Sequence, residues 1–399
     1  MSAGRVLRVG VAGLGRAFTL TLPTLVADQR VRVVAAADPR AEARARFEAQ
    51  FAATAHASVE ALCADAAVDV VYIATPHELH AEHACIAASR GKHVLVEKPI
   101  AVTLAECDAM IEAAARAGVR IVVGPSHSFD APILRTRELV ASGTFGALRM
   151  IHAFYYTDFL YRPRRPEELD STRGGGVVWS QAAHQIDIVR LLGGGLVERV
   201  RAAVGDWDPA RPVDGAYAAL LEFAGGVFAS LTYSGYAHFD ADVFMNDTSE
   251  LGLAKDAARY GAARRALAGV RDPDAEAALK YARGYGGSGL VPPHAEKRRT
   301  HEHFGVHIAS CERADLRPLP DGVMIYGDDA MRFEQIDPPS IPRREVIDEL
   351  YAAIVDGAPP LHDGAWGRAT LEACLALRES ASARRDVVLT RQVGLPAGR

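Results

Sequence analysis

Residues 6–18 read Val-Leu-Arg-Val-Gly-Val-Ala-Gly-Leu-Gly-Arg-Ala-Phe, and this stretch decides the fold. An apolar run typical of a buried strand leads straight into a Gly-x-Gly turn and a helical segment. Gly13 permits the tight turn, and Gly15 lets backbone amides approach a pyrophosphate at the positive end of the next helix. The third position of this fingerprint is usually Gly or Ala, and here it is Phe18. A tight turn without a ligand is therefore the alternative to a nucleotide site.

Outward from this turn, short apolar runs alternate with Ala-rich helical segments as far as residue 123. This alternation is typical of βαβ units around a parallel sheet that is covered on both faces. Thr103 and Glu106 have the spacing of a capping box, and Gly118 marks the end of the same helix. We therefore predict an α/β Rossmann domain over 1–124, with a doubly wound parallel sheet. The predicted strands are 6–12, 31–37, 68–73, 93–96 and 120–123.

Asp38 stands at the end of the second predicted strand, 23 positions after Gly15. A carboxylate there can bind both ribose hydroxyls and repel a 2′-phosphate, which favours NAD over NADP. Arg40 follows and can sit against an adenine or a phosphate, so NADP stays possible. The alternative role of Asp38 is that of a helix N-cap.

The second half of the chain has a different texture, with strand-like runs and few helices between them. We predict strands at 150–156, 197–204, 216–223 and 227–233, with a hairpin turn at Ala224-Gly225-Gly226. This pattern indicates an α+β domain over 125–385 with a large, mainly antiparallel open sheet. Residues 251–289 are predicted to be a partly helical insertion, and 343–382 to be C-terminal helices.

Length, net charge and cysteine content argue against several classes of protein. The 399 residues allow two or three domains, and the net charge of −5 argues against nucleic acid as a partner. The five cysteines form no CxxC pair, which is typical of reduced cytoplasmic proteins. No apolar run is long enough to span a membrane or to form a signal peptide. We expect a cytoplasmic enzyme with a small-molecule substrate and no membrane partner.

Polar residues follow two further strands, at the edge where parallel sheets bind ligands. Thr75-Pro76-His77-Glu78-Leu79-His80 follows one strand, and Glu97-Lys98-Pro99 follows the next. Gly174-Gly175-Gly176 precedes His184 and Asp187 later in the chain. With these motifs the chain resembles the Gfo/Idh/MocA family of nicotinamide-dependent oxidoreductases.

The resemblance implies that Lys98 points between nicotinamide and substrate, that Pro99 shapes the strand end, often through a cis peptide bond, and that His184 is the acid–base residue. The alternatives are a solvated lysine and a hydrogen-bonded helix histidine. The family often has an acidic residue four positions before this histidine, where this chain has Ser180. The predicted cofactor contacts are Gly13, Gly15, Arg16, Ala17, Asp38, Arg40, Thr75, Pro76, His80, Glu97 and Lys98.

Oxidation of a carbinol requires a base for the hydroxyl proton, and a base with a pKa near the working pH acts best. Histidine starts near 6.5 and lysine near 10.4, which favours His184 as the base and Lys98 as the donor to the same oxygen. The two roles can be exchanged. Asp187 either orients His184 or caps a neighbouring segment, and we favour the structural role.

Most family members oxidise sugars or inositols, but segments 126–129, 155–162 and 303–307 resemble the branch that handles cyclic dihydrodiols. Four arginines beside aromatic residues, Arg162, Arg164, Arg165 and Arg173, suit a flat ring with carboxylates, or else form a solvated loop. The predicted reaction is oxidation of a cis-dihydrodiol carboxylate to a catechol, as in phthalate degradation. The alternatives are a sugar or inositol dehydrogenase, an NAD-dependent glycosidase that accumulates no NADH, and a regulator that senses a nucleotide without catalysis. The predicted substrate contacts are His127, Tyr155, Arg162, Arg173, Ser180, Gln181 and His184.

A histidine-rich segment raises the question of a metal. His303 and His307 are four residues apart, with His294, His301 and Cys311 nearby, but the residues between them resemble a strand. We therefore predict no metal and favour substrate contact or sheet packing. The family resemblance further implies a homodimer or homotetramer formed through the sheet of the second domain.

Overall fold

The computed structural model describes residues 4–287 and 299–396. The chain divides into two compact units. The first contains residues 1–125, 278–295 and 341–371, and the second contains 126–277, 296–340 and 372–399. The division at 125/126 lies beside the predicted boundary. Residues 278–287 and 341–371, however, belong to the first unit and not to the predicted second domain.

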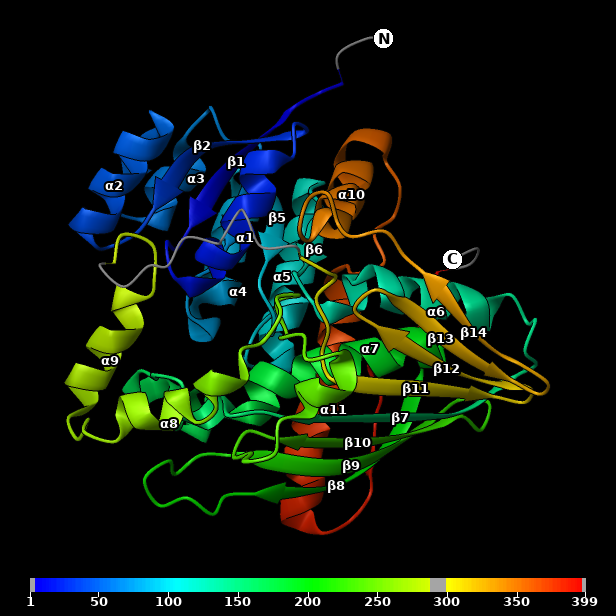
Figure 1. The fold of residues 1–399 in the computed structure, drawn as a ribbon. Helices are drawn as coiled ribbons and strands as arrows, with labels where there is room; N and C mark the ends of the chain where they lie inside the picture. The colour runs from blue at the N-terminus through cyan, green and yellow to red at the C-terminus, as the bar shows by residue number, and fades with distance from the viewer. Residues whose placement is uncertain (1–3, 288–298, 397–399) are drawn as a thin grey trace. The chain divides into compact units, whose positions relative to one another are not determined.

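The first unit contains a six-stranded parallel sheet in the order β3-β2-β1-β4-β5-β6 (Figure 1). This confirms the predicted α/β class. Only β3 was missed, because it is a three-residue strand at the edge of the sheet. The strands are β1 Leu7–Ala12, β2 Val31–Ala37, β3 Thr54–His56, β4 Val70–Ile73, β5 His93–Val96 and β6 Ile121–Val123.

The helices of this unit follow the predicted alternation with the strands. They are α1 Arg16–Ala27, α2 Ala41–Phe51, α3 Val59–Ala64, α4 His80–Ser89 and α5 Leu104–Ala117. The capping box of α5 is confirmed, because the Thr103 hydroxyl accepts from the Glu106 amide and the Glu106 carboxylate accepts from the Thr103 amide. Gly118 ends α5 in the left-handed conformation, at φ +66°.

The C-terminal return explains the correction to the domain boundaries. It contains α10 Arg344–Tyr351, a π-helical turn at Ala352–Asp356, and α11 Gly364–Ala383. The Val123 amide of edge strand β6 donates to the His362 carbonyl at 2.7 Å, and the Thr24 hydroxyl of α1 donates to the Pro342 carbonyl at 2.6 Å. These bonds join the segment to a strand and a helix of the Rossmann unit, so the segment folds with that unit.

The second unit contains a nine-stranded sheet in the order β14-β13-β12-β11-β7-β10-β9-β8-β15. Strands β7 and β10 pair in parallel and the other pairs are antiparallel, which confirms a mainly antiparallel sheet. The hairpin between β9 and β10 is also confirmed, since Gly225 and Gly226 both have positive φ. The strands are β7 Leu148–Tyr156, β8 Val197–Gly205, β9 Ala216–Phe223, β10 Phe228–Ser234, β11 Val306–Cys311, β12 Ala314–Leu319, β13 Gly322–Gly327, β14 Met331–Gln335 and β15 Val387–Val388.

Two helices pack against this sheet. Helix α6, Ala131–Ala141, contacts β12 and β13, and helix α7, Ala183–Gly193, contacts β7 and β10. The predicted insertion is partly helical, with α8 Ala262–Leu267 and α9 Pro273–Ala282, and its residues 288 and 289 lie outside the described part of the chain. The units divide within α9, after residue 277.

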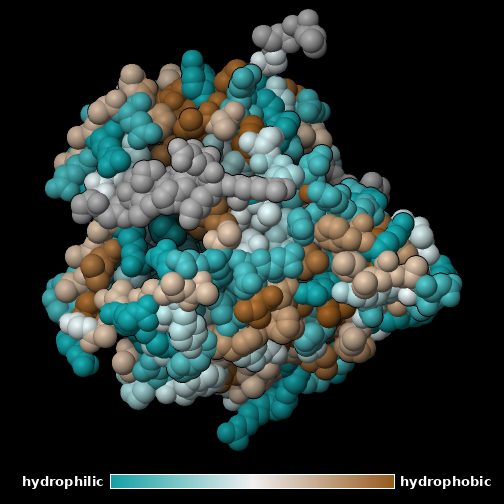
Figure 2. Space-filling model, viewed as in Figure 1, coloured by the Kyte–Doolittle hydropathy of each residue, from teal (hydrophilic) through white to brown (hydrophobic). Residues whose placement is uncertain are grey.

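The surface in Figure 2 intersperses hydrophilic and hydrophobic residues over the face that is viewed. Within residues 4–287 and 299–396, no helix has the length and apolar character needed to cross a bilayer. All five cysteines are free thiols, in agreement with the absence of a CxxC pair.

Candidate functional site

The turn after β1 has the geometry of a dinucleotide site. Gly13 adopts φ +94°, and a Cβ there would lie 2.7 Å from the Ala74 carbonyl oxygen, so only glycine fits. Gly15 is the N-cap residue of α1, and a Cβ at this position would meet no atom within 4 Å. Open space therefore faces a helix N-terminus that has no capping side chain, and an anion fits there.

Asp38 and Arg40 lie on the same turn. The Asp38 carboxylate accepts from the Leu14 amide at 2.8 Å and pairs with the Arg40 guanidinium at 2.9 and 3.0 Å. Phe18, the departure from the glycine fingerprint, is fully buried and packs edge-on against Tyr285, with ring centroids 5.1 Å apart. It does not fill the space in front of Gly15, so these residues fit the pyrophosphate and ribose of a dinucleotide.

His80 joins the ends of β4 and β5. Its Nδ1 lies 2.8 Å from the Pro99 carbonyl oxygen, and its Nε2 lies 3.0 Å from the Thr75 carbonyl oxygen. The ring is fully buried, and burial lowers its pKa. This position does not fit the predicted contact with the cofactor, because both nitrogens face backbone carbonyls. The Lys98–Pro99 bond is cis, as the family resemblance implied.

Glu97 belongs to a buried network and not to an open site. Its carboxylate accepts from the Tyr72 hydroxyl at 2.7 Å, and burial raises its pKa. Tyr72 also lies 3.1 Å from the Thr21 hydroxyl. This bond ties Glu97 to the core, and its contact with the cofactor stays a prediction. Lys98, the next residue, is half-buried.

His184 is positioned by the glycine run and the helix that follows. Gly176 adopts φ +92°, and a Cβ there would lie 2.8 Å from the Val213 side chain. A π-helical turn at Val178–Ala182 leads into α7, which carries the buried His184 in its first turn. Asp187, one turn later, accepts from the Ser128 hydroxyl at 2.5 Å, which agrees with a structural role for this residue.

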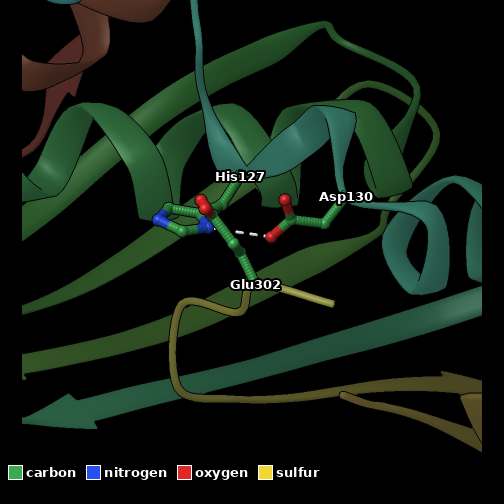
Figure 3. A group of neighbouring side chains, drawn as sticks. All are labelled: His127, Asp130 and Glu302. Atoms are coloured by element: carbon green, nitrogen blue, oxygen red, sulfur yellow. Dashed lines mark hydrogen bonds and ion pairs between the residues drawn. The ribbon is translucent and has the colours of Figure 1, made fainter. Parts of the chain in front are cut away.

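His127 packs against His184 in the second unit. The two ring centroids are 4.7 Å apart, and Phe304 packs against both rings, at 5.2 and 4.9 Å. His127 Nδ1 bonds to Asp130 at 2.8 Å (Figure 3), and Nε2 lies 3.8 Å from a Glu250 oxygen. Burial alone lowers the pKa of His127, but Asp130 and Glu250 outweigh it and raise the pKa to about 9.

The carboxylate of Glu302 completes this cluster, and sequence analysis did not predict it. Potential ligand atoms of His127, Asp130 and Glu302 all lie within 4.8 Å of one another (Figure 3). The one sequence signal was an acidic residue between His301 and His303. The carboxylates of Asp130 and Glu250 stabilise His127 as an imidazolium.

The histidines of segment 301–307 are buried and contact backbone groups of the protein. The His303 Nε2 lies 2.9 Å from the Thr248 carbonyl oxygen, and its Nδ1 accepts from the Gly305 amide at 3.1 Å. His307 lies on strand β11, so the two rings do not share a helix face, and burial lowers the His307 pKa to about 3. His294 lies outside the described residues.

The predicted substrate arginines have carboxylate partners within the protein. Arg162 lies 3.3 Å from Asp158 and 3.4 Å from Glu250. The other three lie near neighbouring acids, Arg164 and Arg165 at 3.8 and 3.4 Å from Glu168, and Arg173 at 3.9 Å from Glu167. Each of the four arginines therefore has a protein carboxylate within 4.0 Å, and their contact with a substrate stays a prediction.

The other predicted substrate residues make contacts within the second unit, close to Phe304 and His184. Tyr155 is buried edge-on against Phe304, with centroids 5.1 Å apart. Gln181 accepts from the Tyr233 hydroxyl at 3.1 Å, and Ser180 donates to the Gly176 carbonyl at 2.5 Å. These contacts position the helix start beside His184.

Comparison with known proteins identifies the family. Residues 7–125 match the oxidoreductase family with an NAD-binding Rossmann fold, and 133–248 match the GFO/IDH/MocA C-terminal domain. A 1-carboxy-3-chloro-3,4-dihydroxycyclohexa-1,5-diene dehydrogenase from Comamonas testosteroni is 48% identical over 94% of each chain. The chain belongs to the Gfo/Idh/MocA family. It is an NAD(P)-dependent oxidoreductase whose first unit binds NAD, which confirms the predicted enzyme class and cofactor.

Two further proteins, one similar in sequence and one also in structure, match a large part of this chain. A trans-1,2-dihydrobenzene-1,2-diol dehydrogenase from Mus musculus is 30% identical over 61% of this chain and 72% of that protein. A crystal structure from Bordetella bronchiseptica RB50, of a protein provisionally assigned as a dehydrogenase, has a TM-score of 0.90 and 41% identity, covering 96% of this chain and all of that one.

Proposed function

We propose that this oxidoreductase dehydrogenates a cyclic cis-dihydrodiol that carries a carboxylate, a phthalate-derived dihydrodiol being the leading example. The name of the Comamonas testosteroni relative describes a ring of this class. The observation that carries the proposal is the buried group of His184, His127 and Phe304 with acidic residues beside it. Carboxylates accept hydrogen bonds from hydroxyl groups, and an imidazole accepts the proton that alcohol oxidation releases.

His184 is the proposed base. It takes the proton of one ring hydroxyl while the carbon bearing that hydroxyl loses a hydride and becomes a carbonyl. The bound nicotinamide supplies the hydride acceptor. The ring centroid of His127 lies 4.7 Å from that of His184. The resulting hydroxyenone tautomerises to a catechol, which favours the forward direction.

Lys98 is proposed to donate to the developing alkoxide. Lys98 lies in the first unit and His184 in the second. A kinetic measurement therefore tests directly whether both residues act on the oxygen of the same substrate hydroxyl. Lys98→Ala and His184→Ala each should retain NADH affinity and lose most of kcat, since both act on the transition state. If both act on one oxygen, the double variant loses less than the product of the single losses. His238→Ala, an exposed histidine, is the control.

A substrate panel tests the class. The panel contains carboxylated cis-dihydrodiols, an unsubstituted cis-dihydrodiol, myo-inositol and glucose, each assayed with NAD and NADP by NADH or NADPH formation. We expect the highest kcat/KM with a carboxylated dihydrodiol and a catechol product by mass spectrometry. Preference for inositol or a sugar would reassign the substrate class, and cofactor binding without turnover of any compound would indicate a sensor.

We also propose a homo-oligomer formed through the sheet of the second unit. Strands β9, β10 and β14 of that sheet carry exposed apolar side chains, Leu220, Phe228, Met331 and Phe333. Exposed apolar groups in one sheet are typical of a protein interface. Light scattering tests this, and Leu220→Asp should lower the measured mass if β9 takes part.

A further inference from the structure

Residues 278–287 pack on the first unit although they lie far along the chain from α1 and α2. Tyr285 is the anchor, because its side chain is 1% exposed and packs edge-on against Phe18 of α1. Its hydroxyl donates to the Gln50 side chain of α2 at 2.7 Å, and the Arg46 guanidinium lies 5.6 Å from its ring centroid. The segment is therefore fixed between two helices of the nucleotide-binding fold.

The same segment reaches the residues that select the cofactor. A Cβ on Gly284 would lie 3.9 Å from the Gly15 backbone and 4.0 Å from an Arg40 nitrogen. The Tyr281 ring centroid lies 5.9 Å from the Arg40 guanidinium carbon. Arg40 is thus held by its ion pair with Asp38 and covered by Tyr281.

We propose that residues 278–287 form a wall of the adenosine end of the NAD site, and that Tyr281 is a positioning residue that selects NAD over NADP. A 2′-phosphate is repelled by Asp38 and is bound only if Arg40 turns away from that carboxylate. Tyr281 opposes this turn through its contact with the guanidinium face. Gly284 lies beside the same group.

The anchor also explains the departure from the nucleotide fingerprint. A Gly or Ala at position 18 would leave the Tyr285 ring without the aromatic edge that it packs against. Phe18 and the segment 278–287 therefore depend on each other. Both family matches end by residue 248, so the segment lies outside the matched domains.

Binding of NADH and NADPH, measured by fluorescence titration without substrate, tests the proposal. In Tyr281→Ala, the ratio of the NADPH Kd to the NADH Kd should fall about two- to fivefold, the size expected for loss of one exposed cation–π contact. Tyr281→Phe keeps an aromatic face and should retain the wild-type ratio. Tyr281 is half exposed, so the alanine variant is expected to fold.

Tyr260→Ala is the matched control, because Tyr260 is an exposed tyrosine of the same insertion, assigned to the second unit. It should leave both constants unchanged. An unchanged ratio in folded Tyr281→Ala, or an equal shift in Tyr260→Ala, would overturn the proposal. Since no substrate is present, failure of the dihydrodiol assignment leaves this result unaffected.

Discussion

Replacement of His127 by glutamine tests the charge beside His184. The His127 side chain is 5% exposed and bonds to Asp130 at 2.8 Å, with Glu250 on its other nitrogen. Burial opposes protonation, but the two carboxylates raise the pKa from 6.5 to about 9. The folded protein therefore holds a proton on this ring under conditions in which the unfolded chain has lost it.

The size and sign of the effect follow from this difference in pKa. A group whose folded pKa lies above its unfolded pKa contributes stability that is complete below pH 6.5 and is lost as the pH rises through about 9. Each pH unit corresponds to about 1.36 kcal/mol, so the full contribution is about 3 kcal/mol. Glutamine does not titrate, so His127→Gln lacks this dependence.

Urea unfolding of both proteins at about pH 6.5 and about pH 9.5 measures the effect. The wild type should lose about 3 kcal/mol more free energy of unfolding over this interval than His127→Gln. Thiols that unfolding exposes titrate in this range in both proteins, and their effect cancels in the comparison. Asp130→Asn should fall between the two, because Glu250 remains. Equal losses in the wild type and His127→Gln would refute the ion-paired imidazolium.

Three further variants test other parts of the structure. Asp38→Ala should weaken NAD more than NADP in fluorescence titrations, and an unchanged ratio would contradict its assigned role. Tyr72→Phe removes the hydroxyl that bonds to buried Glu97, and should lower the free energy of unfolding by about 1.5–3 kcal/mol in urea. Glu276→Gln breaks a buried pair with Arg211 at 2.7 Å and should cost about 3–5 kcal/mol; a loss below about 1 kcal/mol would show that the pair is solvated.

The sequence predicted the first unit better than the second for a physical reason. Parallel strands covered on both faces require nearly continuous apolar runs, and β1, β2, β4 and β5 have them. Strands β12 to β14 were not predicted, because they contain Pro318, exposed charges and half-buried residues that resemble loops. Their strand geometry comes from pairing with neighbours in the sheet, which no local pattern records.

The sequence offered candidate residues but gave little information on their partners. His127 and His184 lie side by side, with ring centroids 4.7 Å apart. Asp130 is only three residues from His127, whereas Glu250 and Glu302 reach it from distant segments of the chain. A local sequence pattern gives no signal for contacts between residues that are distant in the chain. The sequence therefore suggested arginines that bind a substrate carboxylate or lie in a solvated loop, whereas the folded unit pairs Arg162 with Glu250.

This pairing changes what a substrate must offer. A substrate carboxylate that pairs with His127 or Arg162 must share it with a protein carboxylate that already neutralises it. A hydroxyl donates to the same carboxylates without any competing charge. The diol should therefore contribute more to recognition than the carboxylate does. Removing the substrate carboxyl group should change kcat/KM less than removing the hydroxyl that is not oxidised, and the opposite order would place carboxylate recognition elsewhere in the protein.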